Sequence, residues 1–285
     1  MNDMTTTTLT DEWAFPVDTY DLWASPTTSA GTEIEVPQSM ARALVRTDTH
    51  QVLGVHGSKY KAIKHDDVVN SVFDAVRDAN PSRNYDYKID LFENGAKMRG
   101  TINFPDVTIE PAVGDFISFQ IIFYNSYDGS WSFAQQAQGN RLWCLNGCTD
   151  ALTVAKTVAK HTSNVSVSAS SAKIEQGLEC FFDSKHRYQK WMKDKMTDAE
   201  VEKFFKYTLC HVPNNTSQEK WNFKQLDNLM GLWNKEKRTL GSNKWALYNA
   251  CTYWATHTNE SRSPANTRRL RENQLSKHLK MLDFA

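Results

Sequence analysis

The sequence predicts an α+β protein, in which an antiparallel β-meander sheet of about five strands packs with helices and leads into a mostly helical C-terminal part. Three observations support this fold class. Turn dipeptides separate apolar segments between residues 85 and 145, residues 116–124 form a nearly continuous apolar run, and apolar residues recur at helical spacing after residue 172. We divide the chain into an acidic N-terminal arm (1–41), an α+β core domain (42–165) and a helical region with a basic tail (166–285).

Composition sets limits on the partners of the chain. The 285 residues are 40% hydrophobic, enough for a normal core, and 33 Lys plus Arg balance 33 Asp plus Glu. Any attraction for nucleic acid must therefore come from local asymmetry of charge. Five cysteines at irregular spacing argue against a disulfide framework, and neither a leader segment nor a membrane span is recognisable. We expect a soluble protein of the cytoplasm with no membrane partner.

The first third of the chain predicts an arm, two strands and a helix. Isolated aromatic residues such as Phe15 and Tyr20 indicate that the arm docks on its own core or on a neighbouring subunit. Residues 42–63 read as two short strands around Gly57-Ser58. A helix follows, capped by Asp66 or Asp67 and stopped by Asn80-Pro81, with an apolar face of Val68, Val69, Val72, Phe73 and Val76.

Asn94-Gly95 is the clearest local signal, because both residues readily adopt the positive φ of a two-residue hairpin turn. Closing the hairpin there places apolar residues opposite one another on one face and Asp90 opposite Arg99 on the other. The predicted pairs are Leu91 with Met98, Ile89 with Gly100, Tyr87 with Ile102, Tyr85 with Phe104, Asp90 with Arg99, and Lys88 with Thr101.

The meander continues with a central strand at residues 116–124, a turn at Asp128-Gly129, and a further turn at Gly139-Asn140. After Asn146-Gly147 the pattern changes to a helical period. One face of this predicted helix is apolar, and the opposite face carries a basic stripe that includes Lys156 and Lys160. A serine-rich linker at 163–171 then precedes helices predicted at 173–195, from a capping box at Thr197–Glu200, at 217–238 and at 242–258.

Catalytic and metal sites are weakly indicated. Cys144 and Cys148 with His161 have loose spacing for zinc, so buried core cysteines are the preferred interpretation. A magnesium-dependent nuclease would need acids to converge on one ion, and the candidates are Asp66-Asp67, Asp86/Asp90 and Asp106/Glu110/Asp115. The chain has no glycine-rich phosphate loop, no Gly-x-Ser-x-Gly elbow and no His-Glu-x-x-His motif. We therefore assign no catalytic residue, no metal ligand and no cofactor.

A nucleic-acid surface is the remaining candidate. A curved sheet crossed by a helix makes a groove, in which basic residues can follow phosphates while aromatic rings stack on bases. The alternative is that the charged stripe is simply a solvated helix face and that the tryptophan belongs to the core. The candidate residues are Lys97, Arg99, Tyr127, Trp131, Arg141, Lys156 and Lys160.

Several segments resemble a family of phage- and plasmid-related proteins grouped as domain of unknown function 932. The resemblance extends over roughly residues 42–258 and is carried by Gly54 and Gly57 before Tyr60-Lys-Ala-Ile, Asn125-Ser-Tyr-Asp-Gly-Ser130, Leu142-Trp-Cys-Leu-Asn-Gly, Lys160-His-Thr162, and Trp245-Ala-Leu-Tyr-Asn-Ala-Cys-Thr-Tyr253 with His257. More remotely, the order of helix, meander and helix is similar to phage single-strand-annealing proteins of the RecT, Red beta and Erf type. That similarity implies a ring- or filament-forming protein with single-stranded DNA in a basic groove.

From the residues and the resemblance together we expect an ATP-independent protein of a phage or mobile element that binds and anneals single-stranded DNA as a homo-oligomer. It would act in DNA recombination or replication in the host cytoplasm and would not be an enzyme in the bond-making sense. The alternative is a non-enzymatic interaction protein for host takeover or assembly, and a nuclease is the third hypothesis.

Overall fold

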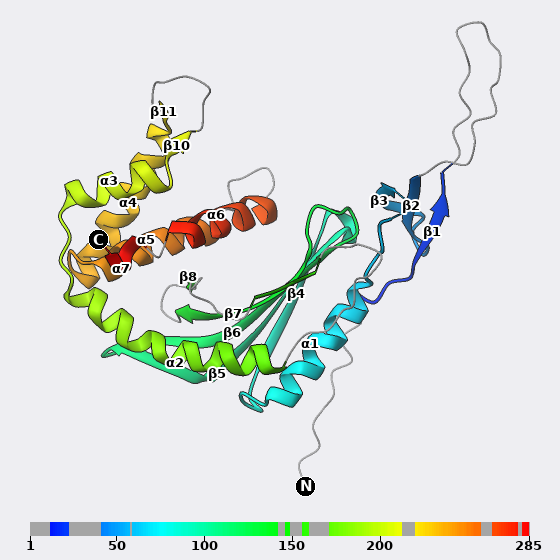
Figure 1. The fold of residues 1–285 in the computed structure, drawn as a ribbon, viewed down its shortest axis with the longest axis horizontal. Helices are drawn as coiled ribbons and strands as arrows, with labels where there is room; N and C mark the ends of the chain where they lie inside the picture. Colours follow the sequence, from blue (N-terminus) through cyan, green and yellow to red (C-terminus); the bar gives the residue numbers. More distant parts are fainter. Residues whose placement is uncertain are drawn as a thin grey trace, which may run out of the picture.

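The computed structural model of the chain describes residues 12–22, 41–57, 59–141, 146–148, 156–159, 171–212, 220–257, 264–278 and 281–284. Antiparallel sheets occupy the N-terminal half and helices the C-terminal part, which confirms the predicted α+β class (Figure 1). Within the described ranges, no helix combines the length and apolar character needed to cross a membrane.

A small antiparallel sheet is built from β1 (Val17–Asp21), β2 (Ala41–Arg46) and β3 (Gln51–Gly57), in that order. Strand β1 and the buried Phe15 belong to the predicted arm, so this part of the arm docks on its own core. The predicted turn at Gly57-Ser58 is wrong. The strands reverse at residues 47–50, where His50 adopts a φ of 58°.

Helix α1 (His65–Ala79) buries the predicted valine face and ends at Asn80, which has a left-handed φ of 43°. The predicted cap is wrong, because Lys64 occupies the N-cap and makes no side-chain capping bond. A residue distant in sequence takes that role. The Tyr127 hydroxyl accepts a hydrogen bond from the backbone N–H of His65 at 2.9 Å, which satisfies one of the free donors at the helix start.

The predicted hairpin register is confirmed between β4 (Asp86–Phe92) and β5 (Lys97–Ala112). Leu91 lies opposite Met98, and the other predicted pairs from Tyr87 to Asp90 also match. Asn94 and Gly95 have φ values of 58° and 95°, and the Ala96 N–H donates to the Glu93 carbonyl at 3.1 Å, as in a type I′ turn. Tyr85 and Phe104 lie beyond the ladder, with ring centroids 5.9 Å apart.

The rest of the large sheet consists of the buried central strand β6 (Asp115–Ser126), then β7 (Phe133–Arg141), β8 (Asn146–Cys148) and β9 (Lys156–Ala159). The order is β4-β5-β6-β7, and both β8 and β9 pair with β7. The turn predicted at Gly139-Asn140 is wrong, because β7 continues through both residues.

The helix predicted after Gly147 is also wrong where the chain is described, because residues 156–159 form a strand. Strand β7 offers a row of backbone donors and acceptors that must be paired, and the β-branched Thr157 and Val158 fit a pleated surface. Lys156 therefore lies opposite Gln136 in a sheet rather than on a helical stripe. Lys160 and the predicted linker at 163–170 lie outside the described residues.

The C-terminal part is helical as predicted. The capping box at Thr197 is confirmed, with Glu200 N–H donating to Thr197 Oγ1 at 3.3 Å and Thr197 N–H donating to Glu200 Oε2 at 2.8 Å. The predicted start at Ser217 is too early, because Asn222 caps the helix that begins at Phe223. The elements are α2 (Ser171–Lys193), α3 (Asp198–Thr208), β10 (His211–Val212), β11 (Lys220–Trp221), α4 (Phe223–Leu240), α5 (Lys244–Thr256), α6 (Pro264–His278) and α7 (Met281–Phe284).

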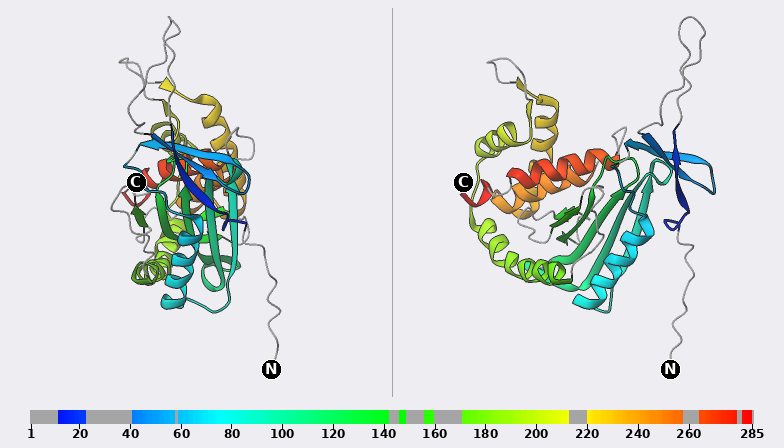
Figure 2. Two further views of the ribbon diagram at one scale, coloured as in Figure 1. Left: turned by 90° about the vertical axis from the view of Figure 1, so that its right-hand side faces the viewer. Right: turned by 45° about the vertical axis from the view of Figure 1, so that its right-hand side comes forward.

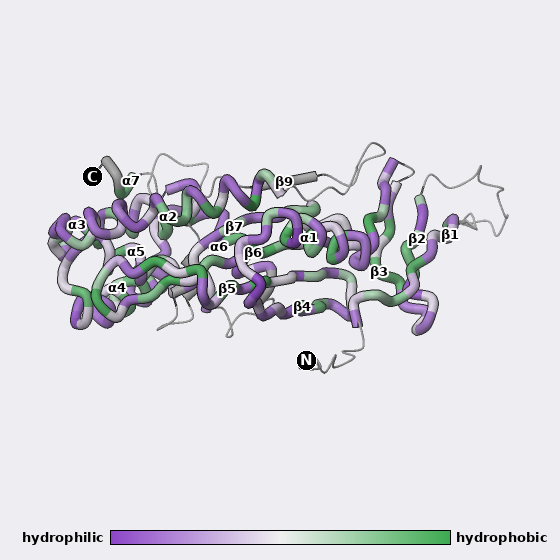
Figure 3. The backbone as a smooth tube through the Cα atoms, turned by 90° about the horizontal axis from the view of Figure 1, so that it is seen from below, coloured by the Kyte–Doolittle hydropathy of each residue, from purple (hydrophilic) through white to green (hydrophobic). Residues whose placement is uncertain are grey.

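One hydrophobic core joins these parts. Buried residues of α1, the large sheet and α2 to α7 form a continuous cluster from Ile63 to Leu282. Helices α1 and α2 cover one face of the curved sheet, while α5 and α6 lie on its other side (Figures 1 and 2). The three-stranded sheet lies at one end of the long axis and α3 and α4 at the opposite end (Figures 1 and 3).

Gly100 is required by this packing. It lies opposite Phe123 in the ladder, and a Cβ at this position would collide with the buried Phe123 ring. We predict that Gly100→Ala lowers the free energy of unfolding by about 1–3 kcal/mol in urea denaturation, the usual cost of overpacking. Gly231→Ala is the matched control, because a Cβ there meets no atom within 4 Å and α4 gains about 0.5–1 kcal/mol. Equal effects of the two substitutions would contradict this account.

Candidate functional site

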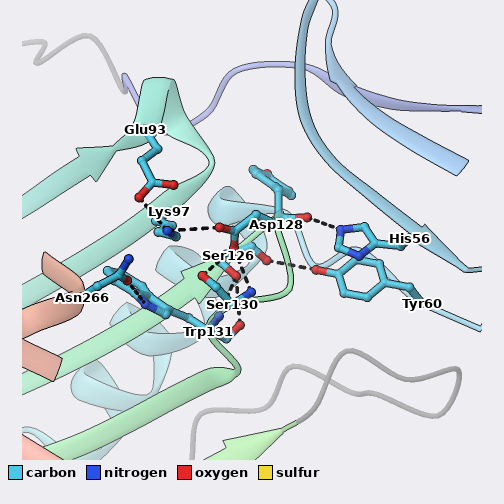
Figure 4. Close-up of polar contacts among 10 residues, drawn as sticks. His56, Tyr60, Glu93, Lys97, Ser126, Asp128, Ser130, Trp131 and Asn266 are labelled. Carbon is cyan, nitrogen blue, oxygen red and sulfur yellow. Dashed lines mark hydrogen bonds and ion pairs between the residues drawn. The ribbon is translucent and has the colours of Figure 1, made fainter. Parts of the chain in front are cut away.

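The candidate site is organised around the turn that follows β6. Ser130 donates to Asp128 Oδ1 through its N–H at 2.9 Å and its hydroxyl at 2.7 Å, and Gly129 adopts a φ of 73°. The Ser126 hydroxyl donates to the Trp131 carbonyl and accepts from the Trp131 N–H, both at 3.0 Å. These bonds close the turn on itself and fix the direction of the Asp128 carboxylate (Figure 4).

Lys97 connects the Asn94-Gly95 hairpin to this turn. Its ammonium lies 2.6 Å from Glu93 Oε1 and 3.1 Å from Asp128 Oδ2, and the residue is 3% exposed. Burial lowers the pKa of Lys97, but the hydrogen bonds to Glu93 and Asp128 outweigh burial and hold that pKa above its usual value. Burial raises the pKa of Asp128, but the two hydrogen bonds from Ser130 and the contact with Lys97 bring it below its usual value. Both groups are therefore charged near neutral pH.

His56 and Tyr60 attach the three-stranded sheet to the other side of the turn. Their rings stack with centroids 3.6 Å apart and planes 9° apart. The Tyr60 hydroxyl donates to the Ser126 carbonyl at 3.1 Å, and His56 Nε2 lies 2.5 Å from the Tyr127 carbonyl. Since a carbonyl only accepts, His56 donates through Nε2. Burial raises the pKa of Tyr60, and the nearby Asp128 adds to this effect, so Tyr60 remains a neutral donor.

Gly54 allows this close approach. A Cβ on Gly54 would lie 2.5 Å from the Tyr127 carbonyl oxygen and 2.9 Å from the Asp128 Cα atom, distances that real side chains do not adopt. Strand β3 can therefore pass directly over the turn only with glycine at this position.

A buried polar network supports the turn from below. Asn125 Nδ2 donates to the Ile63 carbonyl and lies 2.9 Å from His65 Nδ1, while His65 Nε2 lies 2.9 Å from the Gly95 carbonyl. His65 must donate to Gly95 through Nε2, which leaves Nδ1 to accept from Asn125. The segment Asn125–Ser130 thus joins α1, the hairpin turn and the three-stranded sheet.

A pocket of about 320 Å³ opens beside the stacked rings. Its wall comes from β1, β2, β3, residues 60–64 and Tyr127. Every ionisable side chain in the lining apart from the tyrosines is a base: Arg42, His56, Lys61 and Lys64. Arg42 also contacts Asp21 at 3.0 Å, but both side chains are about half exposed, so this pair binds weakly and can yield to another anion. The chemistry of the lining therefore favours an anionic ligand.

The structure brings together three of the residues predicted for nucleic-acid contact, but it buries them. Tyr127 and Trp131 are 1% and 3% exposed, and Lys97 Nζ lies 5.9 Å from the Trp131 ring. Trp131 Nε1 donates to Asn266 Oδ1 of α6 at 3.0 Å. These three residues hold the site together rather than forming an open surface.

The other predicted residues are placed differently. Arg99 points to the α6 side of β5, beside Tyr124, whose hydroxyl donates to Glu272 at 3.2 Å. Arg141 ends β7 and Lys156 begins β9, but their side chains lie outside the described part of the structure, as does Lys160. Sequence reasoning missed Arg42, His56, Tyr60, Lys61 and Lys64, although the Lys-Tyr-Lys-Ala-Ile-Lys run at 59–64 was a visible signal.

The acids considered for a nuclease have separate partners. Asp106 accepts from Ser82 at 2.7 Å, Glu110 from the Gly114 N–H at 2.7 Å, and Asp115 from Trp245 Nε1 at 3.1 Å. No group of three potential ligands that could hold a metal ion occurs among the described residues. Cys144, Cys148 and His161 lie outside the side chains that are described.

Comparison with protein families identifies a match over most of the chain. The family model described as "Domain of unknown function (DUF932)" matches residues 52–275, which include β3 from its second residue, the turn after β6 and residues 60–64 of the pocket lining. No curated protein and no solved structure matches the chain.

The Lys97–Asp128 pair predicts a specific dependence of stability on pH. Asp128→Asn should lower the free energy of unfolding near neutral pH by about 2 kcal/mol, because Lys97 keeps its buried charge but loses one carboxylate. The pKa of Asp128 is lower in the folded protein, so its contribution is complete above the unfolded pKa of about 4 and disappears as pH falls through the folded pKa.

Urea denaturation across the acid range checks this expectation, with the difference between wild type and Asp128→Asn shrinking below about pH 4. Asp74→Asn is the control, because its pair with Arg77 is exposed and should contribute little at any pH. A difference that stays constant through the acid range would show that Asp128 stabilises the turn by hydrogen bonding alone.

Proposed function

Because the chain belongs to the family described as domain of unknown function DUF932, whose description names no activity, we propose a function from the pocket itself: binding of single-stranded DNA. The observation that carries this proposal is the basic lining of the pocket, where Arg42, Lys61 and Lys64 lie beside the stacked His56 and Tyr60 rings. Single strands are bound by positive charge along the phosphates together with ring surfaces for bases.

The arrangement suits backbone contact more than base reading. Lys61 and Lys64 are exposed and project from a short segment whose ends are anchored, at Tyr60 by the Ser126 bond and at Ile63 by burial. Lysine is a point charge with no fixed hydrogen-bond fork, so it recognises phosphate without selecting a sequence. A strand held by its backbone keeps its base edges available for a complementary strand.

We extend the proposal to ATP-independent annealing by a homo-oligomer, in the recombination or replication of a phage or other mobile element. The support is the sequence resemblance described above and the lack of a glycine-rich phosphate loop in the sequence. Annealing needs no bond-making chemistry, so no catalytic residue, metal or cofactor is proposed.

A second candidate function is protein interaction. Tyr20, Val52 and Val55 of the three-stranded sheet are 50%, 56% and 55% exposed, and the register places all three on the same side as Ala43, away from the pocket. An apolar sheet face at the end of the molecule is a common docking surface. This face would be compatible with a host or phage protein partner and with contact between subunits.

The DNA-binding proposal predicts a change in salt dependence. Lys61→Ala/Lys64→Ala should weaken binding to a fluorescent oligothymidylate, and the slope of log affinity against log salt should fall by about 1.4, or about 0.7 for each lost phosphate contact. Fluorescence anisotropy at several salt concentrations measures both quantities. Lys88→Ala/Lys173→Ala is the matched control, because both lysines are exposed, neither lines the pocket, and they belong to β4 and to the start of α2.

Two results would refute the proposal. One is that the wild-type protein shows no binding at low salt. The other is that the Lys61→Ala/Lys64→Ala variant gives the same affinity and slope as the wild type, which would remove the pocket from any DNA contact.

A further inference from the structure

The far end of the helical part carries an exposed cluster of rings. Strands β10 and β11 pair His211 with Trp221 between the end of α3 and the start of α4. The Asn222 N–H donates to the Cys210 carbonyl at 2.8 Å, which closes the base of this short ladder. Figures 1 and 2 show it projecting away from the large sheet, at the opposite end of the molecule from the three-stranded sheet.

Trp221 lies at the centre of the cluster. Its ring centroid is 5.0 Å from that of Tyr207 and 5.5 Å from that of His211, both in edge-to-face geometry. Tyr207 is 53% exposed, and Phe223, two residues beyond Trp221, is 60% exposed. Trp221 holds its neighbours in place while Tyr207, His211 and Phe223 remain accessible to solvent.

The charge around these rings is positive. Residues 201–227 contain four lysines, Lys203, Lys206, Lys220 and Lys224, against three acids, Glu202, Glu219 and Asp227. Glu202 is already paired with Lys206 at 2.7 Å. Lys203 lies four residues before Tyr207, on the same face of α3, and Lys220 and Lys224 flank Trp221 and Phe223; all three are exposed.

We propose that this aromatic end, defined as Lys203, Tyr207, His211, Lys220, Phe223 and Lys224, is a second binding site for single-stranded nucleic acid. Bases stack on Tyr207 and Phe223, and the lysines meet the phosphates. The inference rests on the proposed function, because it assigns a second contact to the same ligand class. With sites at both ends, one molecule holds two separate segments of strand.

The lysines beside the exposed rings favour a nucleic-acid ligand over a protein partner. An apolar docking surface for a protein gains from a neutral centre, because lysine is depleted there. Here lysines flank the exposed rings on both sides in sequence, which is the combination that single-strand binding requires.

The test uses the full chain and removes ring stacking without removing apolar character. We add Tyr207→Leu/Phe223→Leu to the Lys61→Ala/Lys64→Ala variant, which keeps only the second site. We expect the affinity of this combined variant for oligothymidylate to be about tenfold or more below that of Lys61→Ala/Lys64→Ala, because both base–aromatic stacks are lost. Ultraviolet cross-linking of the wild type should give two sets of DNA-linked peptides, one from residues 56–64 and one from residues 203–224. Phe182→Leu, which alters an exposed ring in α2, is the control and should leave affinity unchanged.

The outcomes separate the two proposals. If the wild type binds no DNA, both fail. If cross-links map to 56–64 alone and Tyr207→Leu/Phe223→Leu leaves affinity unchanged, the second site is overturned and the pocket stands. If Tyr207→Leu/Phe223→Leu leaves the affinity for DNA unchanged but loses a protein that co-purifies with the wild type, the rings belong to a protein interface. The second nucleic-acid site is then likewise overturned.

Discussion

The buried ammonium of Lys97 is the interaction on which the arrangement of the site depends. It joins Glu93 of the hairpin to Asp128 of the next turn, and so adds a buried ionic link between two loops that the β5–β6 ladder, which pairs Lys97 with Ser126, brings side by side. The three-stranded sheet docks on the second of these loops through His56, Tyr60 and the bare backbone of Gly54. A charge in such a place is tolerated because two carboxylates and the Trp131 ring surround it. The pocket exists because this docking leaves a gap beside Tyr127.

Local features of the fold could be predicted, since their causes lie within a few residues. The Asn94-Gly95 turn requires positive φ at both positions, and the capping box at Thr197 requires a glutamate three residues later. The region after Gly147 could not be predicted in the same way. The Thr-Val pairs at 153–154 and 157–158 are four residues apart, a spacing that fits a helical period, and only the edge of β7, formed elsewhere in the chain, favours strand β9. The prediction of the α1 cap was wrong for the same reason, because the acceptor at the helix start is the hydroxyl of Tyr127, distant in sequence, rather than a neighbouring aspartate.

The candidate site was predicted in part. The sequence resemblance drew attention to the Asn125–Ser130 segment, around which the candidate site is organised, but the sequence analysis placed Lys97 and Trp131 on an open groove. Nothing local to Lys97 indicates that Asp128, thirty-one residues away in the sequence, will neutralise it. The pocket bases come from β2, β3 and the segment before α1, and this segment is held beside the sheet by the stacking of Tyr60 on His56 and by the bond from Tyr60 to the Ser126 carbonyl. Spacing within one segment carries no information about such a meeting.

The neutral net charge of the chain is compatible with a polyanionic ligand. Charges at a protein surface act over about 10 Å at moderate salt, so a phosphate responds to the nearest side chains and not to the total. Many acids of this chain are engaged by donors of their own: Asp128 by Lys97 and Ser130, Glu272 by Arg268, and Asp198 by Lys237 and Trp233. Their fields are thereby reduced close to the surface, while Lys61 and Lys64 at one end and Lys203 and Lys220 at the other are exposed to solvent. Under our proposal, these two groups of lysines would each attract a strand, and their separation would allow two strands to be held without one excluding the other.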